Sequence, residues 1–129
     1  MLFRNMISQY GASNVVVNGE RTGFQFQFEL PDSPQMSIAL FEKIQVFLDD
    51  EMFEKDAVSI SVDGYNFYLL SQLLDFSEIR WVYGKRAIVR VQKAGGAPTG
   101  CHKVRCVITF RGAKEPAEDS QGCRMLTFV

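Results

Sequence analysis

Hydrophobic and polar side chains alternate without interruption in the clearest stretch of this sequence. It runs from Phe24 to Leu30, and its apolar and polar members are Phe24, Phe26, Phe28 and Leu30 against Gln25, Gln27 and Glu29. Successive side chains of a β-strand point to opposite faces, so such a strand has one apolar and one polar face. A helix would spread the same apolar groups around its circumference. The pattern therefore predicts a half-buried antiparallel strand.

Turn-forming residues divide the rest of the chain into further short strands. We expect hairpin turns at Asn18-Gly19, Asp63-Gly64 and Gly84-Lys85, because Asn-Gly and Asp-Gly pairs accept the positive φ angles of tight hairpins. The prolines after Leu30 should end the first long strand, since proline lacks the N–H group that a strand ladder needs. The expected strands are Asn14–Val17, Thr22–Leu30, Met36–Phe41, Ile44–Leu48, Val58–Val62, Tyr65–Leu69, Arg80–Tyr83, Ala87–Gln92, His102–Arg111 and Arg124–Val129.

Eight to ten short strands joined by hairpins predict an all-β fold, an antiparallel two-sheet β-sandwich. The segment Ser71–Phe76 is expected to form at most one short helical turn, because its serine can cap a turn but the segment is too short for a longer helix. We expect a single domain over residues 1–129. Residues 112–123 are polar, acidic and contain a proline, so they are expected to form an exposed loop.

The charge balance argues against nucleic-acid and membrane partners. Fourteen Lys and Arg against fifteen Asp and Glu give a net charge of -1, so no long-range basic field exists. No apolar run approaches the roughly 20 residues needed to cross a bilayer, and the first residues do not have the pattern of a secretory signal. Cys101, Cys106 and Cys123 are expected to be reduced structural thiols. We therefore expect a cytoplasmic protein.

The sequence offers few groups for catalysis or metal binding. Its single histidine, His102, cannot complete a zinc or iron site alone and is expected to be structural or on the surface. Acidic residues at 49–51 and 115–119 could act as an acid–base pair on a sugar, but both clusters lie in predicted turns, where acidic residues are favoured anyway. We expect no catalytic, cofactor-binding or metal-binding residue in this chain.

One group of residues is a candidate for contact with another molecule. Trp81 and Tyr83 are two positions apart in a predicted strand, so they share a face, and Arg80 precedes them. These residue types are favoured anchors of protein interfaces, and aromatic faces also stack on sugar rings. Trp81 could equally fill the space between two sheets. Core, partner interface and sugar platform therefore stay open, and the candidate interface residues are Arg80, Trp81 and Tyr83.

Several motifs occur in a distinctive order along the chain. They are Gly23-Phe24, the half-turn Tyr68–Leu73, Arg80-Trp81 with Tyr83-Gly84, the run Ala87–Val91, and Gly95-Gly96 followed by Gly100, His102 and Val104. In this order they resemble the small (β) subunit of bacterial C-glycoside deglycosidases. The resemblance covers the chain from Asn14 to Arg111.

The resemblance implies a heteromeric enzyme in which this sandwich supports a larger (β/α)8-barrel catalytic subunit. Such complexes cleave the carbon–carbon bond between a sugar and an aglycone, for example in flavonoid C-glucosides, typically after oxidation of the sugar to its 3-oxo form. The barrel subunit would bind a divalent metal, for which we expect manganese, and would supply the acid and the base. This chain would then be the non-catalytic subunit of a carbon–carbon lyase, with no cofactor of its own and no activity alone.

A second class of function remains an alternative. The chain would then be a free-standing carbohydrate-binding module or an adaptor sandwich in an unrelated assembly. A carbohydrate-binding module would need exposed, coplanar aromatic side chains, and it would bind glycans as a monomer.

Overall fold

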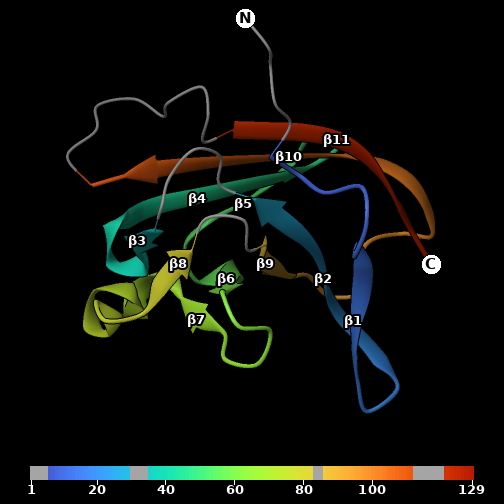
Figure 1. The fold of residues 1–129 in the computed structure, drawn as a ribbon. Helices are drawn as coiled ribbons and strands as arrows, with labels where there is room; N and C mark the ends of the chain where they lie inside the picture. The colour runs from blue at the N-terminus through green and yellow to red at the C-terminus, as the bar shows by residue number, and fades with distance from the viewer. Residues whose placement is uncertain (1–5, 30–34, 83–85, 112–120) are drawn as a thin grey trace, which may run out of the picture.

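The structure, a computed structural model, describes residues 6–29, 35–82, 86–111 and 121–129. It confirms the all-β sandwich: two antiparallel sheets face each other, one with the strand order β1-β2-β9-β6-β7 and the other with β11-β10-β4-β5 (Figure 1). A small third sheet, β3-β8, lies at one end. The strands are β1 Ser13–Val17, β2 Glu20–Glu29, β3 Gln35–Ser37, β4 Phe41–Leu48, β5 Glu51–Phe53, β6 Val58–Ser61, β7 Tyr68–Leu69, β8 Arg80–Val82, β9 Arg86–Gln92, β10 Gly100–Phe110 and β11 Gln121–Phe128.

Residues 24–29 of the alternating stretch lie in β2, at the centre of the protein, and Leu30 lies outside the described part of the chain. Phe24, Phe26 and Phe28 are completely buried between the sheets. The ring of Phe24 meets Phe53 of β5 and Phe128 of β11 edge to face, with centroids 5.8 and 5.7 Å apart. Both contacts cross from the five-stranded sheet to the four-stranded one. The predicted apolar face is therefore the inner face of the sandwich.

The first predicted hairpin is confirmed. Asn18 and Gly19 join β1 to β2 with φ angles of 53° and 79°, the left-handed geometry that lets a two-residue turn follow the twist of its strands. The second predicted hairpin is confirmed only in its pairing. Strands β6 and β7 pair antiparallel, but residues 62–67 connect them in place of a tight Asp63-Gly64 turn, and the return strand β7 has only two residues.

The third predicted hairpin is wrong. Strands β8 and β9 do not pair with each other, because β8 pairs with β3 and β9 lies between β2 and β6. A turn signal between two strand patterns does not determine their neighbours, since each strand can bury more surface against a strand distant in sequence. Residues 83–85 lie outside the described part of the chain.

The predicted strand boundaries between 36 and 53 also need correction. The segment Met36–Phe41 is not one strand, because β3 ends at Ser37 and a 3₁₀ helix spans Ile38–Leu40. The Ser37 hydroxyl caps this helix by accepting a hydrogen bond from the Ala39 N–H at 3.2 Å.

The predicted break at Glu42-Lys43 does not exist. Strand β4 runs through both residues, and its register against β10 shifts there, so Glu42 is the extra residue of a β-bulge. Two consecutive charged residues are typical of a turn, but here both are exposed residues of a continuous strand. Glu51, predicted as part of a turn, begins the short strand β5.

Two further predictions concern the helical segment and the last loop. The helical segment is confirmed as the 3₁₀ helix Leu70–Phe76, and the described residues hold two more single 3₁₀ turns, Ile38–Leu40 and Lys55–Ala57. The exposed loop predicted for residues 112–123 is too long at its end, since β11 begins at Gln121 and pairs with β10 there. Residues 112–120 lie outside the described part.

Candidate functional site

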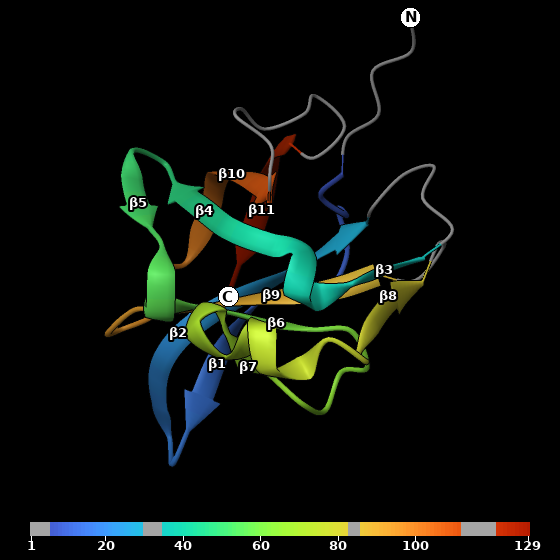
Figure 2. The same ribbon diagram turned by 90° about the vertical axis from the view of Figure 1, so that its left-hand side faces the viewer.

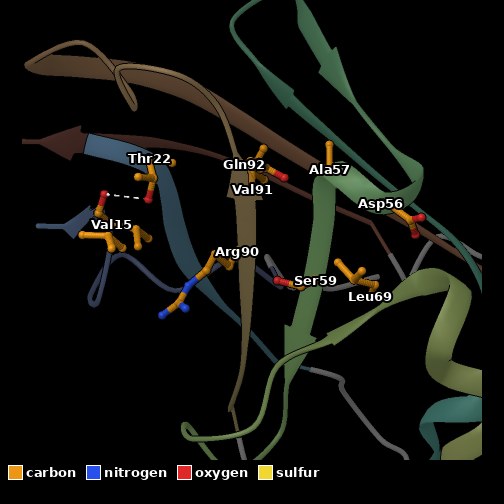
Figure 3. Close-up of a pocket in the computed structure, with 11 residues that line it drawn as sticks. Val15, Thr22, Asp56, Ala57, Ser59, Leu69, Arg90, Val91 and Gln92 are labelled. Carbon is orange, nitrogen blue, oxygen red and sulfur yellow. Dashed lines mark hydrogen bonds between the residues drawn. The ribbon is translucent and has the colours of Figure 1, made fainter. Parts of the chain in front are cut away.

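The outer face of the five-stranded sheet holds an organised group of polar side chains. Strand alternation sends the apolar side chains of β2, β9 and β6 inward, so the residues between them point outward. Cross-strand pairing places Arg90 of β9 between Gln25 of β2 and Ser59 of β6. All three side chains are half-buried. Figure 3 shows Arg90 extending along this face between Val15 and Ser59.

The guanidinium of Arg90 is held on two sides. Its Nε and Nη2 atoms both donate to Gln25 Oε1, at 3.0 and 2.9 Å. Its carbon atom lies 3.7 Å from the centroid of the Phe67 ring, which is cation–π contact. Partial burial lowers the pKa of the Arg90 guanidinium from its ordinary value, although an arginine remains charged at neutral pH after such a change. The side chain is thus a positioned and partly dehydrated cation.

A hollow of about 250 Å³ opens beside Arg90. Its apolar lining includes Val15 and Val17 of β1, Leu69 of β7 and the backbone of Gly23; Val15 and Leu69 are labelled in Figure 3. The lining also includes the Asp56 carboxylate and the polar side chains of Thr22, Ser59 and Gln92, so the hollow combines aliphatic surface with both charged and neutral polar groups.

A second hollow, of about 470 Å³, lies on the same face and is lined by Gln27, Val62, Asp63, Gly64, Arg80, Arg86 and Ile88. Gln27 and Ile88 form a cross-strand pair two positions along from Gln25 and Arg90, which places both hollows on one side of the sheet. Arg86 lies 3.8 Å from Glu29 at this end. Arg80 belongs to this lining and is exposed, so one predicted interface residue lies on this face.

The interface role of all three residues, Arg80, Trp81 and Tyr83, stays a prediction. The backbone of Trp81 pairs with Met36 in the β3-β8 sheet. Tyr83 lies outside the described part of the chain. Sequence patterns did not identify Arg90, Gln25 and Phe67 as a group. Gln25 and Arg90 could be recognised only as polar positions of alternating strands.

The loop between β6 and β7 borders the second hollow and is fixed by one carboxylate. Asp63 Oδ1 accepts from the Tyr65 N–H at 2.8 Å, the Asn66 N–H at 2.9 Å and the Ser61 hydroxyl at 3.0 Å. These donors, led by the backbone N–H of Asn66, hold the pKa of Asp63 well below its usual range. Tyr65 stands at the tip of this loop with 89% of its surface exposed.

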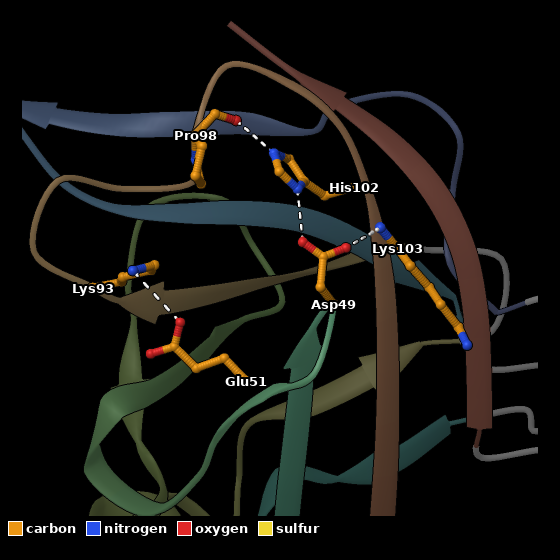
Figure 4. A network of polar contacts seen from close by, with 6 residues as sticks. All are labelled: Asp49, Glu51, Lys93, Pro98, His102 and Lys103. Carbon is orange, nitrogen blue, oxygen red and sulfur yellow. Dashed lines mark hydrogen bonds and ion pairs between the residues drawn. The ribbon is translucent and has the colours of Figure 1, made fainter.

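A separate polar cluster joins the four-stranded sheet to the loop before β10 (Figure 4). The Nδ1 atom of His102 lies 2.8 Å from Asp49 Oδ2, and Nε2 lies 2.9 Å from the Pro98 carbonyl oxygen. Asp49 Oδ1 accepts from the Lys103 N–H at 3.1 Å. The hydrogen bond from His102, followed by that from Lys103, lowers the pKa of Asp49. Each ring nitrogen of His102 is therefore engaged within the protein.

The described residues contain no group of three His, Cys, Asp or Glu side chains that could hold a metal ion. Within the same residues, no helix is long and apolar enough to span a membrane. The organised groups are instead an arginine, an amide and a ring beside an aliphatic hollow. The fold and this face define a β-sandwich domain suited to binding another molecule by its surface.

Comparison with known proteins assigns the family. Residues 2–113 match the family model of the C-glycoside deglycosidase beta subunit. One relative, the C-glycoside deglycosidase beta subunit of Eubacterium cellulosolvens, is 27% identical over 114 residues, which are 88% of this chain and 77% of the relative. The chain belongs to the C-glycoside deglycosidase beta subunit family.

Proposed function

We propose that this chain is the non-catalytic β subunit of a heteromeric C-deglycosidase. The observation that supports the proposal most strongly is the family match over residues 2–113. A beta subunit implies a partner, and the relative from Eubacterium cellulosolvens has the same description. In this proposal the partner is a larger (β/α)8-barrel subunit that performs the reaction, and the present sandwich stabilises it and helps to shape its site.

The proposed reaction is cleavage of the carbon–carbon bond between a sugar and its aglycone in 3-oxo C-glucosides, such as those of flavonoids. A ketone makes the neighbouring C–H bond more acidic, so a positioned base can remove that proton and the aglycone can leave by elimination. The partner subunit would supply the base, the acid and a divalent metal, for which manganese is our proposal. A metal of this kind would stabilise the negative charge that develops on the ketone oxygen.

The side chains of this chain agree with a supporting role. The imidazole of His102 has one ring nitrogen on Asp49 and the other on the Pro98 carbonyl, so its contacts are structural. Burial raises the pKa of the Cys106 thiol, which disfavours the reactive thiolate. The surface groups around Arg90 are suited to recognition rather than to proton transfer.

The test is to assay the chain alone, the larger subunit alone and the two together on a 3-oxo C-glucoside. We expect release of the aglycone by the complex and none by this chain alone. Cleavage by the isolated chain would contradict the non-catalytic role. Failure of the two chains to associate would contradict the subunit assignment.

The carbohydrate-binding alternative predicts a different result for the isolated chain. Titration with a glucoside while monitoring the fluorescence of Trp81 distinguishes the two functions. A supporting subunit should give little change, whereas a saturable change would favour the binding module.

A further inference from the structure

We propose that the outer face of the five-stranded sheet is the surface on which the larger deglycosidase subunit docks, and that a carboxylate side chain of that subunit, flanked by apolar residues, pairs with Arg90. This inference rests on the proposed function, because it requires a partner subunit. It names the face, the central residue and the chemistry of the contact.

The charge of Arg90 is uncompensated within the described part of the chain. Its neighbours are an amide oxygen, at Gln25, and a ring face, at Phe67, both of which are neutral. No carboxylate of the described residues lies within ion-pair distance of it, whereas Arg86 on the same strand has Glu29 at 3.8 Å. A half-buried cation has lost part of its hydration, so a carboxylate that approaches it replaces lost solvent with a strong hydrogen-bonding partner.

The guanidinium is positioned to accept such a partner. An arginine has five N–H donors, and Gln25 engages one on Nε and one on Nη2. The remaining donors, on Nη1 and Nη2, form the end of the guanidinium that binds a carboxylate with two parallel hydrogen bonds. Contact with Gln25 and Phe67 already restricts the side chain, so less conformational entropy is lost on binding.

The surroundings of Arg90 favour a protein segment as the occupant. The adjoining hollow has an aliphatic wall, and Val17 in that wall is 52% exposed. The β1-β2 hairpin and the β6-β7 loop both extend past the five-stranded sheet, away from the other sheet, and lie on either side of this face (Figures 1 and 2). Tyr65, at the tip of the β6-β7 loop, is a residue type that often anchors interfaces.

The chain contains a matched control residue on the opposite side of the sandwich. Arg105 of β10 also lies over a phenylalanine ring, that of Phe47, at 5.2 Å from its centroid. Arg105 is exposed and belongs to the outer face of the four-stranded sheet. Removal of its charge changes the net charge of the chain by the same amount as removal of the Arg90 charge, but on the other face.

The experiment measures the dissociation constant of the complex between the full chain and the larger subunit, by calorimetry, for the unaltered chain, Arg90→Gln and Arg105→Gln. We expect Arg90→Gln to weaken binding at least tenfold, about 1.4 kcal/mol, and Arg105→Gln to change it less than about twofold. Arg90→Lys should give an intermediate loss, because lysine keeps the charge without the planar donor pair. The affinity of the unaltered chain should also fall more steeply with salt than that of Arg90→Gln.

Each other outcome overturns the inference. If the unaltered chain forms no complex, both the proposed function and the docking surface are wrong. If the complex forms and Arg90→Gln binds as tightly as the unaltered chain, or if both glutamine variants lose affinity equally, only the docking surface is wrong. Two further measurements apply if the Arg90→Gln chain still forms the complex. Binding of benzoate that depends on Arg90 would then assign this face to a small carboxylate. A dimer that depends on Arg90 in sedimentation would assign it to a second copy of this chain. Melting temperatures of the variants confirm that they are folded.

Discussion

His102 and Asp49 are joined by a 2.8 Å contact between Nδ1 and Oδ2, although 53 residues separate them in sequence. The other ring nitrogen of His102 lies against the Pro98 carbonyl oxygen. Carbonyl and carboxylate oxygens only accept hydrogen bonds, so in either contact the imidazole can act only as the donor. The pair therefore fastens the β4-β5 turn to the loop that leads into β10.

This contact gives a prediction for acid stability. Because the hydrogen bond from His102 lowers the folded-state pKa of Asp49 below its ordinary value of 3.8, the carboxylate stabilises the fold above that value, and the contribution is lost as the pH falls through the lowered pKa. We expect Asp49→Asn to lower the melting temperature at pH 7 and to reduce its decline between about pH 5 and pH 2. Asp50→Asn, at the adjacent exposed position, is the control. Identical pH profiles for the two variants would contradict the role of Asp49.

A second prediction concerns the lining of the hollow beside Arg90. A methyl group added at Gly23 would clash with the Val91 carbonyl oxygen, which belongs to the backbone and cannot rotate away. We expect Gly23→Ala to force β2 and β9 apart and to lower the free energy of unfolding by about 1–3 kcal/mol. Urea unfolding measures the change. Gln92→Ala, at the exposed cross-strand partner of Gly23, should change the same quantity by less than about 0.5 kcal/mol.

A third prediction concerns Asn14, which joins three segments. Its Oδ1 accepts from the Ala97 N–H at 2.7 Å, and its Nδ2 donates to the carbonyl oxygens of Ala97 and Val129 at 3.0 and 3.1 Å. We expect Asn14→Ala to reduce the free energy of unfolding by about 1–3 kcal/mol, because the part-buried N–H and carbonyl groups of Ala97 lose their partner. Ser13→Ala is the neighbouring control. If both variants unfold at the same urea concentration, Asn14 does not stabilise the fold in this way.

The three cysteines give a fourth prediction. Cys101 and Cys123 are exposed on the outer side of the four-stranded sheet, whereas Cys106 is buried and its thiol pKa is raised by that burial. We expect a chromogenic disulfide reagent to modify two thiols of the folded chain rapidly and the third only after denaturation. Variants with serine at position 101 or 123 should each lose one rapidly reacting thiol. Rapid reaction of all three would show that the strand containing Cys106 opens readily.

Local rules predicted much of the fold. Strict alternation identified the inner face of β2, and the Asn18-Gly19 turn was correct because its φ angles depend only on those two residues. The bulge at Glu42 was not visible in the sequence, since it depends on the register between β4 and β10. The partner of β8 depends in the same way on a distant strand, β3.

The candidate site was less predictable than the fold. Arg80 was singled out because of its aromatic neighbours; it lines the second hollow, and its role in an interface stays a prediction. The central group is different, because Gln25, Phe67 and Arg90 belong to separate parts of the chain and meet only through strand order. None of these residues belongs to a recognisable sequence motif. Their proximity can be predicted only if it is known that β9 lies between β2 and β6.

The position of Phe24 has a consequence for how this protein unfolds. Its ring packs against Phe53 and Phe128, so one side chain of the first sheet joins both edge strands of the second. If one sheet unfolded, the apolar inner face of the other sheet would be exposed to water. Unfolding should consequently be a two-state transition without a populated intermediate. Circular dichroism and the fluorescence of tyrosine and tryptophan should then give the same sigmoidal curve.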